Sequence, residues 1–217
     1  MSVYYLFSDF HMEKGFTTEV VSNLLIDIKD NNKIVFIASS PEHNSNTDKY
    51  AQRYLEWFSN IGIKFKLSTV IDNRMRKGEM IENIKDASVI FLMGGQTLTQ
   101  FKFLKENDLD KALRICEGCI LGLSAGAINM AKISINTEKS GQDRAVIYEG
   151  LNLVDVSIEP HFNPKGSGIE YDKLLEASEK YDIYAMCDNS AIVCRGKEQF
   201  FYGEIYFISK GKLEKVN

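Results

Sequence analysis

The position in this chain best suited to nucleophilic chemistry is a serine between two glycines. Ser124 stands where an apolar, strand-like run gives way to small, helix-forming residues, in the order Gly-Leu-Ser-Ala-Gly. A strand that turns sharply into a helix at a serine lifts the hydroxyl out of the core, and it aims the N–H group of Ala125 at an oxygen that becomes negative. Gly122 and Gly126 permit the close backbone approach in such a turn. The pattern predicts a nucleophile at Ser124, against the simpler interpretation of small residues that only allow close packing.

A serine needs a base to become a good nucleophile, and the chain has 3 histidines. His161 lies at the carboxyl end of the predicted strand 153–162, and open parallel sheets place their sites at that edge. His11 and His43 follow the first and second predicted strands in polar stretches that are typical of exposed loops. We predict that His161 is the base, with His11 and His43 as the alternatives.

A second donor for a negative oxygen is expected from the turn after the fourth predicted strand. Gly94 and Gly95 end that strand just before a helix, so that their N–H groups can point into the same crevice as Ser124. Gln96 and Thr97 follow and offer side-chain hydrogen bonds to a substrate. The alternative is an ordinary tight turn.

The segments that must position these residues alternate between two periodicities. Short β-branched or aromatic runs predict strands, and longer segments with apolar residues at helical spacing separate them. Parallel strands need crossovers of this length, usually helical and right-handed. The sequence therefore predicts an α/β fold, a doubly wound and mainly parallel sheet with helices on both faces. The predicted strands are 3–7, 33–40, 63–70, 88–95 and 119–124, and two of the predicted helices are 18–30 and 47–62.

The pattern loosens after the fifth strand. Residues 133–150 are predicted to be loop with a short strand, 153–162 a strand and 168–181 a helix. Short, antiparallel strands are predicted within 183–187, 191–196 and 199–211. Because no linker or repeat interrupts the chain, we expect residues 1–217 to form a single domain.

The four cysteines do not predict a metal or redox site. Cys116 and Cys119 form a C-x-x-C pair, but it follows a helix end, whereas redox pairs use a helix N-terminus to lower the thiol pKa. A structural zinc site would need a second close pair, and Cys187 and Cys194 lie too far apart. Structural thiols are the interpretation that we favour.

Composition excludes several partners. The apolar share is 44%, the charged share 26% and the formal net charge -4, without the clusters of Lys and Arg that a nucleic-acid surface needs. No apolar run is long enough for a membrane span, and the first residues lack a secretory signal. We expect a cytoplasmic monomer or homodimer that acts on a small peptide without nucleic acid, membrane, metal or organic cofactor.

Three motifs together resemble a known family. FLMGGQT, GLSAGA and IEPHF, in this order and spacing, resemble the dipeptidase E and cyanophycinase family of serine peptidases, whose fold is similar to the flavodoxin-like fold of class I glutamine amidotransferases. The resemblance implies a Ser-His-acid hydrolase with Ser124 as nucleophile and His161 as base, and Gly95 and Ala125 as oxyanion donors. Because the related amidotransferases carry cysteine at the elbow, the serine argues against glutamine hydrolysis.

The chain departs from the family pattern at two points. The family's acid comes from the segment between nucleophile and histidine, where Glu138 is the predicted third member and Asp143 its rival. An arginine beyond the histidine looks like the reader of an amino-terminal aspartate in dipeptidase E, but residues 161–181 contain none and offer lysines such as Lys165 and Lys173. A lysine lacks the bidentate fork of arginine, which puts aspartyl specificity in doubt.

The function that these residues predict is hydrolysis of dipeptides or short peptides through an acyl-enzyme on Ser124. Three alternatives stay open. An esterase of the α/β-hydrolase class shares the elbow and the order serine, acid, histidine. A catalytically silent member that only binds a small ligand, or a purely structural protein, would lack an activated serine.

Overall fold

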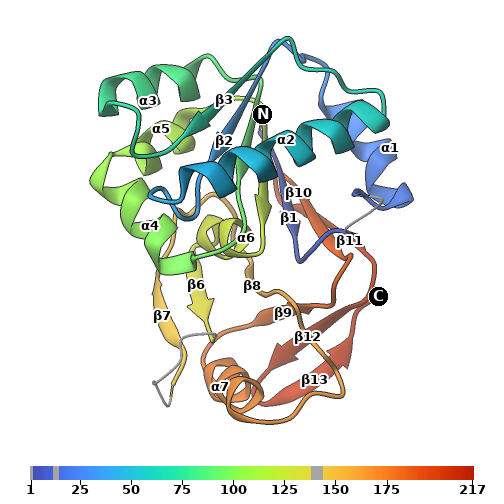
Figure 1. The fold of residues 1–217 in the computed structure, drawn as a ribbon. Coiled ribbons are helices and arrows are strands. Elements are labelled where there is room, and N and C mark those ends of the chain that lie inside the picture. Colours follow the sequence, from blue (N-terminus) through green and yellow to red (C-terminus); the bar gives the residue numbers. More distant parts are fainter. Residues whose placement is uncertain (1, 12–14, 138–143) are drawn as a thin grey trace.

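The computed structural model describes residues 2–11, 15–137 and 144–217. Its main sheet has seven strands in the order β11-β10-β1-β5-β4-β2-β3 (Figure 1). Five neighbouring strands are parallel, as the alternating sequence pattern predicts, and at one edge β10 pairs antiparallel with both β1 and β11. The parallel strands are β1 (Val3–Phe7), β2 (Lys33–Ile37), β3 (Leu67–Ile71), β4 (Val89–Leu92) and β5 (Cys119–Leu123), and the antiparallel pair is β10 (Ala191–Arg195) and β11 (Glu198–Tyr202).

Helices cover both faces of this sheet. Successive residues of each strand point to opposite sides, so that each strand contributes side chains to both faces. In β4, Ile90 and Leu92 belong to one core cluster, and Val89 and Phe91 to the other. The Phe91 side is covered by α1 (Thr18–Asp27) and α2 (Asn44–Asn60). The Leu92 side is covered by α3 (Lys77–Lys85), α4 (Thr97–Glu106), α5 (Leu109–Ile115) and α6 (Ala125–Met130).

A second, smaller layer lies beside the carboxyl ends of the parallel strands (Figure 1). It is a four-stranded sheet in the order β13-β12-β9-β8, and α7 packs on it around a third core cluster. Its strands are β8 (Ser157–Glu159), β9 (Ile183–Met186), β12 (Ile205–Ser209) and β13 (Lys212–Lys215), and α7 spans Ile169–Ser178. Within the predicted strand 153–162, only the central residues, those of β8, form a strand. β9 pairs antiparallel with β12, as predicted, but parallel with β8.

Residues 133–150 contain more regular structure than predicted. β6 (Ile133–Asn136) and β7 (Val146–Glu149) pair antiparallel as a two-stranded sheet. The polar residues that suggested a loop alternate with apolar ones, and such alternation suits strands with one solvated face.

One buried serine joins the two layers. The N–H group of Ser8, just after β1, donates to the carbonyl of Ser190 (3.2 Å), and its hydroxyl donates to the carbonyl of Met186 (3.0 Å). The end of β1 is therefore tied to the chain that leads from β9 to β10, and the two layers meet at the carboxyl edge of the main sheet. No helix within the described residues has the length and apolar character to cross a membrane.

Candidate active site

Ser124 occupies a strained turn between β5 and α6. Its φ is 47° and its ψ is -107°, a conformation that a non-glycine residue rarely adopts. A Cβ at Gly126 would lie 2.2 Å from the carbonyl oxygen of Leu92, and one at Gly122 would lie 2.7 Å from the backbone nitrogen of Ala127. Both glycines are therefore required by close backbone approach, as the sequence analysis predicts for a sharp turn here.

His161 lies against this serine. Its Nε2 is 2.9 Å from Ser124 Oγ. The backbone of His161 is left-handed, with a φ of 56°. The N–H group of His161 donates to the hydroxyl of the buried Ser8 at 2.7 Å, and the next N–H group, from Phe162, donates to Met186. These bonds hold the backbone in a conformation that costs free energy, and they aim the imidazole at Ser124.

The acid that contacts the histidine is Asp188. Its Oδ1 lies 2.9 Å from His161 Nδ1, so that serine, histidine and aspartate form one chain of contacts. The histidine and aspartate side chains are 38% and 59% exposed. Solvent therefore reaches the pair directly.

Sequence reasoning missed Asp188 because it searched only between the serine and the histidine. The residue stands in the turn that joins β9 to β10, where the N–H group of Ser190 donates to the carbonyl of Cys187. An aspartate directly after the strand-like run 183–187 was the available signal. Glu138, the predicted acid, and Asp143, its rival, lie outside the described residues.

A second carboxylate lies beside the same imidazole. Asp9, after β1, is half-buried, and its carboxylate lies within 4.8 Å of ligand atoms of both His161 and Asp188. Its Oδ1 accepts a hydrogen bond from the N–H group of Phe10 at 2.7 Å. Asp9 and Asp188 therefore place two carboxylates close to one imidazole.

The turn after β4 supplies the expected neighbour of the serine. Gly95 has a φ of 132°, and a Cβ there would lie 2.4 Å from the hydroxyl oxygen of Ser39, which itself donates to the carbonyl of Gly94. Gly95 and Gln96 are exposed at this edge, next to β5. Thr97 is buried, so the groups of this turn that stay open to a ligand are those of Gly95 and Gln96.

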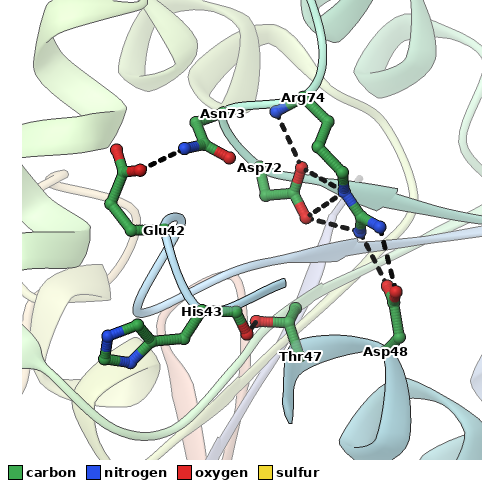
Figure 2. Close-up of polar contacts among 7 residues, drawn as sticks. All are labelled: Glu42, His43, Thr47, Asp48, Asp72, Asn73 and Arg74. Carbon is green, nitrogen blue, oxygen red and sulfur yellow. Dashed lines mark hydrogen bonds and ion pairs between the residues drawn. The ribbon is translucent and has the colours of Figure 1, made fainter. Parts of the chain in front are cut away.

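The two alternative histidines lie elsewhere. His43 is exposed at the start of α2, where its carbonyl accepts a hydrogen bond from Thr47, and Figure 2 shows its imidazole directed away from Asp72 and Arg74. His11 is exposed and bridges to Gly15 through its backbone. The histidine that contacts Ser124 is His161.

The cysteines are free thiols, as the sequence analysis favours. Cys119 and Cys194 are buried, and burial raises the pKa of the Cys194 thiol to about 12. Cys116 and Cys187 are partly buried, and burial raises the pKa of both. Thiols with raised pKa values are poor nucleophiles near neutral pH, so the chemistry is left to the serine.

Comparison with known proteins places the fold and the motifs in one family. The family model "Peptidase family S51" matches residues 6–201. The "Uncharacterized peptidase Lmo0363" of Listeria monocytogenes serovar 1/2a (strain ATCC BAA-679 / EGD-e) is 32% identical over 129 residues, which cover 56% of this chain and 63% of that protein. The aligned part of this chain therefore spans less than two thirds of that relative.

Two solved structures share the fold. A peptidase from an acI-B1 Actinobacterium superposes with a TM-score of 0.71 at 16% identity, covering 100% of this chain and 94% of the other. A protein named "Putative Peptidase E Protein" from Listeria monocytogenes EGD-e superposes with a TM-score of 0.68 at 23% identity, covering 93% and 98%. At these identities the likeness concerns the fold, a mixed α/β architecture with a central, mostly parallel sheet.

Proposed function

This chain belongs to peptidase family S51, the dipeptidase E family of serine peptidases, and from that premise we propose that it hydrolyses the peptide bond of dipeptides or short peptides. The observation that carries the proposal is the contact series from Ser124 Oγ to His161 Nε2 and from His161 Nδ1 to Asp188 Oδ1, both 2.9 Å. A hydroxyl, an imidazole and a carboxylate in this order constitute the machinery of acyl transfer.

In the first half of the reaction, His161 accepts the hydroxyl proton as Ser124 Oγ attacks the peptide carbonyl carbon. The carbonyl oxygen becomes negative, and the N–H groups of Ala125 and Gly95 are the donors that we assign to it. Asp188 accepts the Nδ1–H bond, which keeps Nε2 free to take the proton and stabilises the imidazolium that results.

In the second half, the tetrahedral carbon loses the amine. His161 gives its proton to the leaving nitrogen, and the acyl group remains as an ester on Ser124. Water then attacks the acyl carbon while His161 removes one of its protons. The bond between the acyl carbon and Ser124 Oγ breaks, His161 returns the proton to Ser124 Oγ, and the acid is released. The exposure of the histidine and aspartate side chains gives water a direct approach to this step.

A fluorophosphonate probe tests the proposal, because it labels serines that a base activates. We expect mass spectrometry to find the label on Ser124 and on no other serine of the wild-type protein. Ser124→Ala and His161→Ala should both abolish labelling, and circular dichroism should show that each variant is folded. Ser167→Ala, at an exposed serine near His161, serves as the matched control and should keep full labelling. A folded wild-type protein that resists the probe and cleaves no dipeptide would overturn the proposal.

A further inference from the structure

We propose that Ser39 is a positioning residue for the oxyanion donor Gly95, because its hydroxyl fixes the direction of the peptide group between Gly94 and Gly95. This inference rests on the proposed function and adds a residue to the machinery of that same site. Ser39 is only 7% exposed, and its hydroxyl donates a hydrogen bond to the carbonyl of Gly94. A buried hydroxyl therefore holds one end of the peptide group whose other end, the Gly95 N–H, is assigned to the substrate.

The sheet places this peptide group between Ser39 and Ser124. Strand β4 lies between β2 and β5. The last row of residues that pairs these three strands consists of Ile37, Leu92 and Gly122. Ser39, Gly94 and Ser124 each stand two residues beyond this row. A Cβ at Gly94 would lie 3.4 Å from the carbonyl oxygen of Leu123, the residue before Ser124. Gly94 therefore has the Ser39 hydroxyl on one side and the backbone that leads into the proposed nucleophile on the other.

The direction of the Gly95 N–H group follows from the geometry of a trans peptide, in which the carbonyl and N–H bonds point in opposite directions. No peptide bond within the described residues is cis. Because the Gly94 carbonyl points toward Ser39 on the β2 side, the Gly95 N–H group points toward the β5 side, where Ser124 stands. Gly95 is exposed, and in the part of the chain that the structure describes its N–H group donates to no protein acceptor. This donor is open to a substrate oxygen.

Two glycines in succession leave a peptide group free to turn over unless a partner holds it. Glycine adopts positive and negative φ almost equally well, and Gly95 has a φ of 132°. A reversed peptide group would direct the Gly94 carbonyl oxygen toward the Ser124 side, where it would repel a negative oxygen. The hydrogen bond from Ser39 stabilises the observed direction. It also polarises the amide, which makes the N–H group a stronger donor.

The backbone that leads to Ser39 and to Gly94 is itself held in place. The N–H group of Met93 donates to the carbonyl of Ile37 at 3.0 Å. The side chain of Gln100 is fully buried, and its Nε2 donates to the carbonyl of Met93 at 3.0 Å and to that of Ile37 at 3.3 Å. Because both segments are fixed just before the contact, the hydroxyl of Ser39 meets the Gly94 carbonyl in a defined geometry.

The test measures how fast a fluorophosphonate labels Ser124, because the tetrahedral product places a phosphoryl oxygen where the negative oxygen of the substrate would lie. Ser39→Ala should lower the maximal labelling rate about tenfold, with the probe concentration that gives half of that rate unchanged. This loss is smaller than the factor of about 10²–10³ for removal of a whole donor, because the Gly95 N–H group remains and is only directed less well. Dipeptide hydrolysis should show the same division, with kcat lower and KM unchanged.

Two further variants separate the hydrogen bond from packing and from general stability. Ser39→Cys keeps the size of the side chain but offers only a weak donor, so it should be labelled about as slowly as Ser39→Ala. Ser178→Ala is the matched control, because Ser178 is buried in α7 and its hydroxyl donates to the carbonyl of Leu175 at 2.7 Å. It should keep the wild-type labelling rate, whether or not its melting temperature falls.

The role of Ser39 and the proposed function fail on different results. If wild-type protein is labelled at Ser124 and folded Ser39→Ala is labelled at the same maximal rate, the role of Ser39 is wrong and the proposed function stands. A change in the half-maximal probe concentration alone would also contradict it, because Ser39 would then act in binding. If Ser39→Ala does not fold by circular dichroism, the rate of Ser39→Cys decides. A folded wild-type protein that the probe does not label overturns the proposed function, and the inference with it.

Discussion

Two polar clusters stand at the carboxyl edge of the main sheet, and they use similar residues for different ends. After β3, Arg74 lies between Asp48 and Asp72, as Figure 2 shows. After β8, His161 lies between Ser124 and Asp188. Both clusters place a basic side chain between two partners that arrive from different elements. They differ in the basic group itself, which is a guanidinium in the first cluster and an imidazole in the second.

We call the Arg74 cluster closed because the guanidinium pairs with both oxygens of each aspartate, although the Arg74 side chain is itself 47% exposed. The guanidinium donates to both oxygens of Asp48 at 2.7 and 2.9 Å, and it reaches both oxygens of Asp72 at 2.6 to 3.0 Å. The Asp72 side chain is only 1% exposed, and its Oδ1 also accepts from the N–H group of Arg74. Asn73 donates to Glu42 in the same turn. An arginine does not release its proton near neutral pH, so this arrangement holds a loop and does no proton transfer.

The His161 cluster is open. An imidazole has one ring nitrogen that can donate and one that can accept a hydrogen bond, and the Asp188 side chain is 59% exposed. The strain is also placed differently, since Ser124 and His161 both have positive φ values whereas the Arg74 turn has none. Closed charge pairs stabilise a fold, and open strained ones leave groups available for a substrate. Four substitutions test this contrast.

The largest effect is expected at the open cluster. Ser124→Ala removes the nucleophile, and dipeptide turnover should fall by several orders of magnitude, because the members of such a unit act together. Steady-state kinetics and a thermal melt measure activity and stability in parallel. A variant that kept wild-type turnover would remove the distinction between the two clusters.

The second-largest effect on turnover is expected at the acid. Asp188→Asn should lower kcat by about 10²–10⁴, because the amide favours the wrong tautomer of His161. Glu138→Gln and Asp143→Asn provide the matched comparison and should leave kcat within about twofold. The reverse result would assign the acid to the segment between serine and histidine. In the double variant Asp9→Asn/Asp188→Asn, kcat should be lower than in either single variant, because Asp9 lies beside the same imidazole.

Ser8 tests whether backbone strain at the open cluster matters. Ser8→Ala removes the acceptor of the His161 N–H bond, and we expect kcat to fall about tenfold with little change in KM. Ser8→Thr keeps a hydroxyl and should restore most of the activity. A merely structural role predicts instead a lower melting temperature with kcat unchanged.

The closed cluster should respond in stability alone. Arg74→Ala leaves the buried Asp72 without its guanidinium and should cost about 1–2 kcal/mol in the free energy of unfolding, with kcat unchanged. The hydrogen bonds from Arg74 hold the pKa of Asp48 below its ordinary value. This contribution is present above the unfolded pKa and is lost as the pH falls through the folded one. The difference in stability between wild type and variant should therefore begin to shrink in urea melts as the pH falls below the ordinary aspartate pKa of about 4.

Some parts of the fold and the site could be predicted from the sequence, and others could not. The parallel strands and the turn at Ser124 follow from local pattern, because alternation, glycine and a strand-to-helix junction lie within a few residues of one another. His161 follows the carboxyl end of a strand, as predicted, although that strand is only Ser157–Glu159. The sequence analysis predicts only a short strand where β6 and β7 pair, because the polar residues of these strands resemble those of a loop.

The sequence by itself determined the turn at Ser124, the proposed nucleophile, because Gly122 and Gly126 permit the close backbone approach on either side of it. Only the tertiary structure decided which carboxylate meets His161. Asp188 follows it by many residues and reaches it because β9 lies beside β8 in the second layer. Contacts between distant segments depend on how layers pack, and no local periodicity encodes that.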